Sequence, residues 1–406
     1  MRRSLYSFLG VAFGLCALPT LSLPTPSLAE DLYTEHYGKF DLHLDHYWQA
    51  PLHADSHDDF GAFDLEPGLL VEWDNVQLVM EPRLSSGDSG AGRVDPAQVN
   101  IQASNAHYDL LVGTNIEFWG KVESFNPVDI INSYDYTRGL TRGQKLGAPM
   151  VKLSTPIGPG QLVIYALPQF VENIYPGSAS RLRTGAAVHS DAVSYSGGAN
   201  HGDMGRALRW SGYFGDVDLA VSHFSGIGRD GRFLPQSDGR LKADYSRITQ
   251  NGIDVQYLRG DTALKAEVIR RTGQYDRLGK MGSYEAGIIG VEHNLYDLAG
   301  TGYDVVLLAE FAKDSRKLDS HTGFQKDLIG GARLLFNDVD DSEALLLVTR
   351  DLDYNATTTR LSYSTRVTDN LVIKAAASFN NGLEKDANNA IFANDQYASV
   401  TLSYSY

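Results

Sequence analysis

The chain has 406 residues and an acidic balance, with 35 Lys and Arg against 50 Asp and Glu and a formal net charge of −15. This charge excludes most nucleic-acid binders, because phosphate binding depends on a surplus of Lys and Arg. The single Cys excludes a disulfide framework and a cysteine-based zinc site, and 43% hydrophobic with 10% aromatic residues exclude a disordered chain.

Residues 1–29 have the pattern of a secretory signal peptide. Arg2 and Arg3 give a positive start, the segment 5–23 is largely apolar, and Ser27-Leu28-Ala29 is a small-x-small cleavage site. An uncleaved anchor helix is the alternative, but three prolines interrupt the segment. Cleavage leaves 377 residues without Cys and lowers the net charge to −17, because the removed segment carries two Arg and no acid. The mature chain is therefore expected outside the cytoplasm.

After residue 30, apolar and polar residues alternate over segments of about ten residues. In one of them, Val99, Ile101 and Ala103 alternate with Asn100 and Gln102. A period of two indicates a strand with one apolar face. Many such segments separated by turns are typical of a transmembrane β-barrel. A soluble β-sandwich or propeller is the alternative, although no repeat of about 40–50 residues supports a propeller.

The pattern predicts an all-β, antiparallel up-and-down barrel of about 18 strands, with short turns alternating with longer loops. The strands are expected at residues 38–49, 62–73, 75–83, 97–105, 107–119, 149–156, 161–170, 204–213, 216–224, 250–259, 262–272, 284–294, 302–312, 327–336, 342–352, 357–367, 370–379 and 396–406. Bacterial barrels have short periplasmic turns, longer external loops and an even number of strands. Sixteen strands is the alternative, because the stretches 171–203 and 225–249 are long enough to contain further strand.

The last ten residues and the aromatic residues at strand ends favour an outer-membrane location. The final strand ends on Tyr404 and Tyr406 on its apolar face, and it resembles the C-terminal strand by which bacterial barrels are recognised by the barrel assembly machinery. Trp48, Trp73 and Tyr213 stand at strand ends, as aromatic girdles at the two membrane interfaces require. We therefore expect one barrel domain over residues 30–406, in contact with outer-membrane lipid and lipopolysaccharide.

A lipid-facing apolar surface requires that the polar face of each strand lines the interior. Acidic inward residues are concentrated on the first five strands, whereas Arg333, Arg360, Arg366 and Lys374 form a basic wall on later strands. Separated charges would create a transverse field in a water-filled lumen and favour polar or charged solutes. The alternative is that the charges pair across the wall and neutralise one another.

The third external loop, residues 120–148, is too apolar for a solvated loop. Phe125, Val128 and Ile131 predict a short helix docked inside the barrel, with Pro127 near its start. A lid packed on the rim is the alternative. The expected pore constriction, at and beside this loop, consists of Glu117, Trp119, Lys121, Glu123, Asp129, Asn132 and Asp135.

This region resembles two groups of outer-membrane proteins. The inward-folding third loop is similar to that of general porins. Trp119-Gly120-Lys121 followed by Asp129-Ile130-Ile131-Asn132 resembles a porin-like outer-membrane family of Gram-negative proteobacteria, and the resemblance extends through 145–150 and 167–170. It implies the barrel fold and brings no established substrate.

The sequence therefore predicts an outer-membrane, porin-like channel for passive diffusion of small polar or charged solutes, without a cofactor. A transporter of hydrophobic compounds is the alternative, and a barrel-type hydrolase is a weaker one, because no nucleophile elbow or His-Glu-x-x-His motif occurs. The acidic loop at residues 53–59 contains metal-ligand types, but a solvated external loop is the preferred interpretation, and no metal or catalytic site is predicted. Both a homotrimer and a monomer fit the pattern.

Overall fold

The computed structural model describes residues 32–87, 92–138, 143–183, 185–188, 192–320, 322–386 and 388–406. The predicted signal peptide lies outside these residues. So does His189-Ser190-Asp191, which has the residue types of a catalytic triad but, as three adjacent residues, does not predict one. The description below concerns the compact unit Tyr33–Tyr406.

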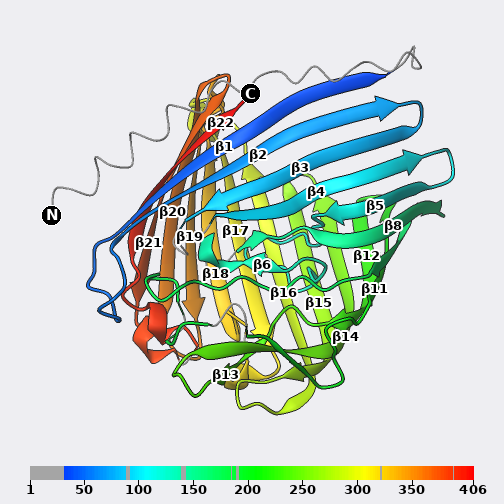
Figure 1. The fold of residues 1–406 in the computed structure, drawn as a ribbon. Coiled ribbons are helices and arrows are strands. Elements are labelled where there is room, and N and C mark those ends of the chain that lie inside the picture. Colours follow the sequence, from blue (N-terminus) through cyan, green and yellow to red (C-terminus); the bar gives the residue numbers. More distant parts are fainter. Residues whose placement is uncertain are drawn as a thin grey trace. The chain divides into compact units, whose positions relative to one another are not determined.

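Eighteen antiparallel strands form a closed barrel (Figure 1). They are β1 (Tyr33–Tyr47), β2 (Asp59–Trp73), β3 (Val76–Ser86), β4 (Arg93–Ser104), β5 (Asp109–Asn115), β8 (Ala148–Ile157), β9 (Gly160–Leu167), β11 (Gly205–Phe214), β12 (Val217–Ile227), β14 (Leu241–Arg259), β15 (Thr262–Tyr275), β16 (Met281–Leu295), β17 (Asp304–Asp314), β18 (Lys326–Leu335), β19 (Glu343–Asp351), β20 (Thr357–Thr368), β21 (Leu371–Asn381) and β22 (Tyr397–Ser405). The barrel closes where β1 pairs with β22, with Lys39 opposite Ser405 and Tyr47 opposite Tyr397. The prediction of 18 strands is confirmed, and the alternative of 16 is wrong.

Short turns join strands at one end of the barrel and longer segments join them at the other, which we call the turn end and the loop end. Gly215 and Gly260 adopt positive φ angles of 62° and 56° in two of the turns, a conformation that tight hairpin turns require and glycine adopts at low cost. At the loop end, β10 (Ser194–Ser196) and β13 (Arg232–Pro235) pair with an extension of β14. The two long stretches therefore do contain further strand, but it lies outside the barrel wall.

Side chains alternate between the outside and the inside of the wall, as the sequence predicted. On β15, Leu264 and Val268 are exposed whereas Glu267 between them is buried. Trp73 and Phe214 lie exposed on the outward face at the turn end, and Trp48 follows β1 at the loop end. Tyr213, which the sequence placed in this girdle, is directly opposite the inward residue Asp218 and therefore lies on the inner face. Aromatic residues thus mark both ends of an outward apolar band, as in membrane-embedded barrels.

The largest buried apolar cluster lies inside the barrel. It joins residues of the connection between β5 and β8 to inward residues of β5, β8, β9, β11, β12 and β14–β18. We call this connection, residues 116–138 and 143–147 in the described part, the inward loop. The inward folding of the third loop is confirmed, and the rim-lid alternative is wrong.

The predicted short helix at residues 125–131 is wrong. This segment is irregular and contains a turn in which the N–H of Asp129 donates to the carbonyl of Asn126 at 3.1 Å. Wall side chains accept hydrogen bonds from the backbone N–H groups just before this segment, and Pro127 has none to offer. An intrahelical ladder is therefore not needed to satisfy the backbone.

The other short elements are peripheral. The inward loop contains β6 (Tyr134–Asp135), β7 (Gln144–Lys145) and the 3-10 turn η1 (Tyr136–Arg138). Four further 3-10 turns are η2 (Leu298–Gly300), η3 (Lys317–Asp319), η4 (Leu383–Lys385) and η5 (Ala390–Phe392). Across the described ranges, no helix is long and apolar enough to cross a membrane.

Candidate functional site: the barrel interior

Asn132 ties together the two ends of the inward loop. Its Oδ1 accepts a hydrogen bond from the N–H of Glu117 at 2.8 Å, and its Nδ2 donates to the carbonyls of Asn115 and Leu146 at 2.9 and 2.8 Å. The side chain is 1% exposed, so all of these bonds are sheltered from water. A buried amide with several satisfied hydrogen bonds fixes local geometry. Asn132 therefore closes the neck of the loop.

Glu117 anchors the start of the loop to the wall. Its carboxylate accepts hydrogen bonds from Lys152 Nζ on β8 at 2.8 and 3.1 Å and from the Tyr165 hydroxyl on β9 at 2.9 Å. Asn115 Nδ2 adds a further bond at 2.7 Å. Charge-assisted hydrogen bonds of this kind are each stabilising by about 1.5–3 kcal/mol, so the loop begins at a firmly held position.

Trp119 and Lys121 contact the next strands of the wall, beyond β9. The Trp119 ring lies 5.2 Å from the Arg209 guanidinium, a cation–π distance. Lys121 Nζ lies 2.5 Å from Asp218 and 3.7 Å from Asp254. These strands, β11, β12 and β14, follow one another in the sheet, so the loop crosses several strands instead of following one.

Two wall glutamates bind the loop backbone directly. Glu267 on β15 accepts hydrogen bonds from the N–H groups of Lys121 and Val122 at 2.6 and 3.2 Å. Glu310 on β17 accepts from the N–H groups of Glu123 and Ser124 at 2.7 and 3.1 Å. Both glutamates are buried, and their charges are met by backbone donors. Four consecutive loop residues are therefore held by two carboxylates on the wall.

The centre of the loop is packed as tightly as a protein core. Val128 and Ile131 are both 0% exposed, and Gln250 on β14 donates to the carbonyl of Val128 at 3.3 Å. The buried Arg229, just after β12, donates to the carbonyl of Ile131 from Nε at 3.1 Å and from Nη2 at 2.6 Å. Burial lowers the pKa of Arg229 to about 10. The loop therefore fills one side of the lumen as a fixed insertion.

Two buried aspartates stabilise the return of the loop. Asp129 pairs with Lys145 at 2.5 Å, and burial raises the pKa of its carboxyl against the opposing effect of Lys145. Asp135 pairs with Arg93 on β4 and accepts a hydrogen bond from the N–H of Thr137 at 2.8 Å. The loop thus reaches from the covered wall to β4.

Glu123 and Arg333 bring together the predicted constriction and the predicted basic wall. Arg333 Nη2 on β18 lies 3.2 Å from Glu123 Oε1, and the two side chains are 33% and 24% exposed. The other six constriction residues are more buried than Glu123. Glu123 is therefore the member of the set that reaches furthest toward the remaining lumen.

The other basic-wall residues have different positions. Arg360 and Lys374 are exposed on β20 and β21, with Lys374 opposite Ser364 and Thr401 in the strand register. Arg366 binds Asp341 at 2.7 Å and the carbonyl of Val339 at 2.8 Å. Because this turn joins β18 to β19 at the turn end, the structure does not bring Arg366 to the inward loop.

The inward loop also binds β2 and β3, where Arg138 pairs with Asp64 at 2.9 Å and Arg83 donates to the carbonyl of Lys145 at 2.9 Å. The remaining strands, β20–β22 and β1, carry a mainly polar inner surface, and we call them the uncovered wall. Lys39 and Asp41 pair on β1 at 2.6 Å. The Lys39 side chain remains 42% exposed. Within the described ranges, no carboxylate lies within ion-pair distance of Lys374. Partly exposed polar side chains are expected along a water-filled passage.

The inward charges are paired around most of the barrel. On strands that the inward loop contacts, Lys152 pairs with Glu117 at 2.8 Å and Arg209 with Asp254 at 2.7 Å. On β1–β3, Lys39 pairs with Asp41, Arg138 of the loop with Asp64, and Arg83 with Glu66. The pairing alternative therefore describes these acids, whereas Lys374 is an exposed basic residue on β21.

Glu310 and Arg229 were missed by sequence analysis. Glu310 lies on the same face of β17 as buried Leu308 and Ala312, opposite to exposed Leu307, so assignment of strand faces would have placed it inside. Arg229 follows β12 in a loop, where no periodicity indicates its direction. Its partner is a backbone carbonyl, which leaves no signal in the sequence.

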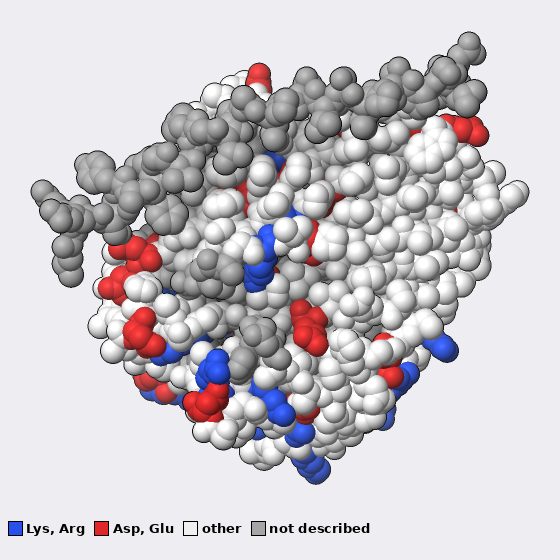
Figure 2. All heavy atoms as spheres, in the orientation of Figure 1, with Lys and Arg blue, Asp and Glu red and all other residues white. Residues whose placement is uncertain are grey.

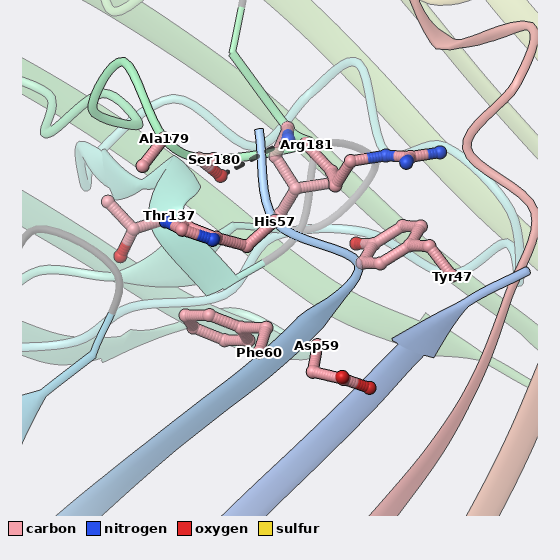
Figure 3. A pocket seen from close by; sticks show the side chains of 9 residues that line it. Tyr47, His57, Asp59, Phe60, Thr137, Ala179, Ser180 and Arg181 are labelled. Atoms are coloured by element: carbon pink, nitrogen blue, oxygen red, sulfur yellow. Dashed lines mark hydrogen bonds between the residues drawn. The ribbon is translucent and has the colours of Figure 1, made fainter. Parts of the chain in front are cut away.

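The acidic loop between β1 and β2 packs against the segment 177–183 at the loop end. Arg183 binds Asp55 at 2.8 Å, and Arg181 binds Asp58 at 2.9 Å and Asp395 at 2.8 Å. Tyr47 and Arg181 line a small pocket in this layer (Figure 3). In the described part of the chain, no three His, Cys, Asp or Glu residues are arranged to hold a metal ion.

The fold is similar to two solved outer-membrane barrels. A BenF-like porin from Pseudomonas fluorescens Pf-5 aligns with a TM-score of 0.54 and 12% identity, over 93% of this chain and 98% of the porin. Wzi from Escherichia coli, described as a carbohydrate-binding β-barrel involved in group 1 capsule assembly, aligns with a TM-score of 0.53 and 13% identity, over 90% of this chain and 83% of Wzi.

These comparisons define the class of fold. No family model matches the chain, and no curated protein matches its sequence. The resemblance of residues 119–170 to a porin-like family is therefore not supported by a family model. The chain has the closed 18-stranded barrel fold found among outer-membrane porins.

Proposed function

We propose that this protein is an outer-membrane channel through which small polar or charged solutes diffuse passively, without a cofactor. The observation that carries the proposal is the divided interior of the barrel. The inward loop is packed against β5–β19 and binds side chains of β2–β4, while β20–β22 and β1 present partly exposed polar side chains such as Lys39 and Lys374. A passage between the loop and this polar wall would be wet, charged and narrow.

The glutamates and arginines around the loop give this passage a defined width. Glu267 and Glu310 hold the loop backbone on the covered wall, and Glu123 with Arg333 marks its exposed edge. A loop held by buried charges and a packed core has little freedom to swing away. We therefore propose a static constriction bordered by Glu123 and Arg333, in which the remaining predicted constriction residues serve as anchors.

The alternative of a transporter for hydrophobic compounds is less well supported. It requires an unoccupied apolar pocket and a lateral opening in the wall. The apolar interior found here is filled by Val128, Ile130 and Ile131 of the chain itself, and neighbouring strands are paired around the barrel, including β1 with β22. The similar solved structures support the barrel fold, and one of them is a porin.

The remaining parts of the proposal concern biogenesis and surroundings. We propose that residues 1–29 direct export and are removed, and that β22 is recognised by the barrel assembly machinery. The exposed apolar band would contact outer-membrane lipid. A monomer and a homotrimer are both compatible with the closed wall.

Planar-bilayer recording of the folded, inserted protein tests the channel. We expect stepwise conductance and, in liposome-swelling assays, entry of small polar solutes in preference to apolar ones. Absence of conductance from protein whose insertion is verified by heat-modifiable gel mobility would contradict the proposal. Rapid uptake of apolar compounds alone would support the hydrophobic transporter instead.

A further inference from the structure

Basic residues form a row on the outer surface of one side of the barrel. Each lies at an outward position near the loop end of its strand, on six of the strands between β11 and β19. The row consists of Arg206, Arg247, Arg270, Lys313, Lys326 and Arg350. We call it the outer basic row. Figure 2 shows Lys and Arg together with Asp and Glu atoms along the lower edge of the view, and a broad surface with few charges above it on the right.

Lys313 and Lys326 form the centre of this row. They are directly opposite each other in the register of β17 and β18. Both are exposed, and the residues that flank Lys313 in sequence, Ala312 and Asp314, are buried inside the barrel, so the two lysines point outward. Like charges directly opposite on neighbouring strands are destabilising. In the described residues no carboxylate lies within ion-pair distance of either lysine.

Acidic neighbours compensate the rest of the row only weakly. Arg270 lies 3.6 Å from Glu285, but both side chains are about two-thirds exposed, and an exposed pair at this distance contributes little. Arg247 pairs with Asp203 at 3.1 Å. Arg350 donates to the carbonyl and side chain of Asn355, which leaves its charge uncompensated.

The row lies where the outward apolar band ends. On β17, Leu307 and Phe311 precede Lys313 on the same face, and on β18 Leu328 follows Lys326. On β15, Leu264 and Val268 precede Arg270 in the same way. The positive charge is therefore placed at one interface of the membrane, at the end that carries the long loops.

The other side of the barrel lacks this feature. At outward loop-end positions of β20–β22 and β1–β4, the described residues include Thr357, Phe379, Leu84 and Val94. His46, on β1, contacts Asp59 at 2.8 Å. No Lys or Arg occupies an outward position on these described strands. The row is therefore a local patch and not a general property of the rim.

We propose that the outer basic row binds the phosphate groups of the phosphorylated glycolipid of the outer leaflet, the lipid A part of lipopolysaccharide. This inference rests on the proposed outer-membrane location. A ligand that fits this surface has phosphate groups at the membrane interface, next to the basic row, and acyl chains along the adjacent apolar band. Lys and Arg near a membrane surface bind anionic head groups in this way, and Arg forms bidentate contacts with phosphate. The paired lysines are stabilised when a phosphate lies between them.

The test measures binding of purified, folded protein to bisphosphorylated lipid A by native mass spectrometry in detergent. The double variant Lys313→Glu/Lys326→Glu is expected to lose lipid A binding by at least about tenfold. The matched control is Arg259→Glu, an exposed residue of β14 at the turn end, which should retain wild-type binding. Heat-modifiable gel mobility verifies that each variant is folded.

Three probes separate the sources of the signal. Dephosphorylated lipid A and inorganic phosphate should bind the wild type at least about tenfold more weakly than lipid A. Equal binding of phosphatidylglycerol would indicate a general anionic-lipid surface, and equal loss in the Arg259→Glu control would indicate net charge alone; both results would overturn the proposal. Preferential binding of a second copy of the chain, abolished by the same double variant, would identify a subunit interface instead.

Conductance is recorded on the same preparations, so the two proposals fail separately. The double variant should form channels with wild-type conductance, because both lysines lie outside the lumen. If the wild type conducts but does not bind lipid A, only the lipid proposal is refuted. Intact lipid binding without conductance would refute only the channel.

Discussion

The N–H group of Lys121 donates a hydrogen bond to Oε1 of Glu267, 2.6 Å away, across the interior of the barrel. The same oxygen accepts from Val122 and from Asn126 Nδ2 at 3.2 and 3.1 Å. One buried carboxylate therefore holds three donors of the inward loop. This contact explains how a loop without regular secondary structure keeps a fixed position in a lumen.

Replacement of Glu267 should loosen the loop without opening the barrel. In Glu267→Gln the hydrogen bonds to Oε1 lose their charge, which costs about 1–3 kcal/mol of local stability. We expect faster hydrogen exchange at residues 121–126 and larger, noisier channel currents. Glu292→Gln, on the next strand and paired with Lys265, is the matched control and should leave both unchanged. Unaltered exchange in Glu267→Gln would show that apolar packing alone fixes the loop.

Exchanging the charges of Glu123 and Arg333 should change ion selectivity in a reciprocal way. Arg333→Glu places two carboxylates at the edge of the loop and should shift the reversal potential toward cation selectivity. Glu123→Arg should shift it toward anions, and the double exchange should return it close to the wild-type value because the pair is restored. A double variant whose reversal potential stays far from the wild-type value would mean that the residues act at separate places in the lumen.

Lys374 and Arg366 should respond differently to the same substitution. Lys374 is exposed on the uncovered wall, whereas Arg366 is bound to Asp341 in a short turn. We expect Lys374→Glu and Arg360→Glu to raise cation selectivity measurably. The effect of Arg366→Glu on reversal potential should be the smallest of the three, with the main loss in stability. A larger selectivity change for Arg366→Glu would contradict the assigned positions.

Asp129 should make the stability of the loop depend on pH. Burial raises the pKa of its carboxyl, so between the unfolded and folded pKa values the folded protein binds more protons than the unfolded chain. Its contribution is therefore fully present below the unfolded pKa and is lost as pH rises through the raised folded value. Asp129→Asn removes this contribution.

Urea unfolding in vesicles between about pH 4 and pH 7 measures the effect. The free energy of unfolding of the wild type, relative to Asp129→Asn, should increase as the pH is lowered. Asp216→Asn, in the short turn between β11 and β12, is the control. Parallel pH profiles for the wild type and Asp129→Asn would contradict the raised pKa and show that the pair with Lys145 cancels the effect of burial.

The wall could be predicted from sequence because strand pattern is local. Alternation places Leu264 and Val268 outside and Glu267 inside, and short turns such as that at Gly260 set the strand order. The apolar residues Val128 and Ile131 correctly indicated that the third loop folds inward. Each of these signals depends only on residues close together in the chain, so the periodicity of the sequence shows it.

Contacts across the lumen could not be predicted, because they depend on where the loop crosses the barrel. Nothing near Glu310 indicates that its partners are backbone N–H groups of the loop. Arg366 lies on the expected strand and faces the interior, but it binds Asp341 at the turn end and does not approach the inward loop. Its level along the barrel axis depends on this turn contact, which the strand pattern does not show. The apolar filling of half the lumen is likewise a property of the packed loop and not of the wall sequence.

The single-channel conductance of two neighbouring alanine variants tests the central claim most directly. Ala375 and Ala376 lie side by side on β21 and face opposite sides of the wall: Ala375 is opposite the exposed Tyr363 and Val400, and Ala376 is opposite Ser362 and Ser399. If solutes pass between the inward loop and the uncovered wall, Ala376→Trp should reduce conductance several-fold and Ala375→Trp should leave it unchanged. Equal conductance of both variants and the wild type would contradict a passage along this wall.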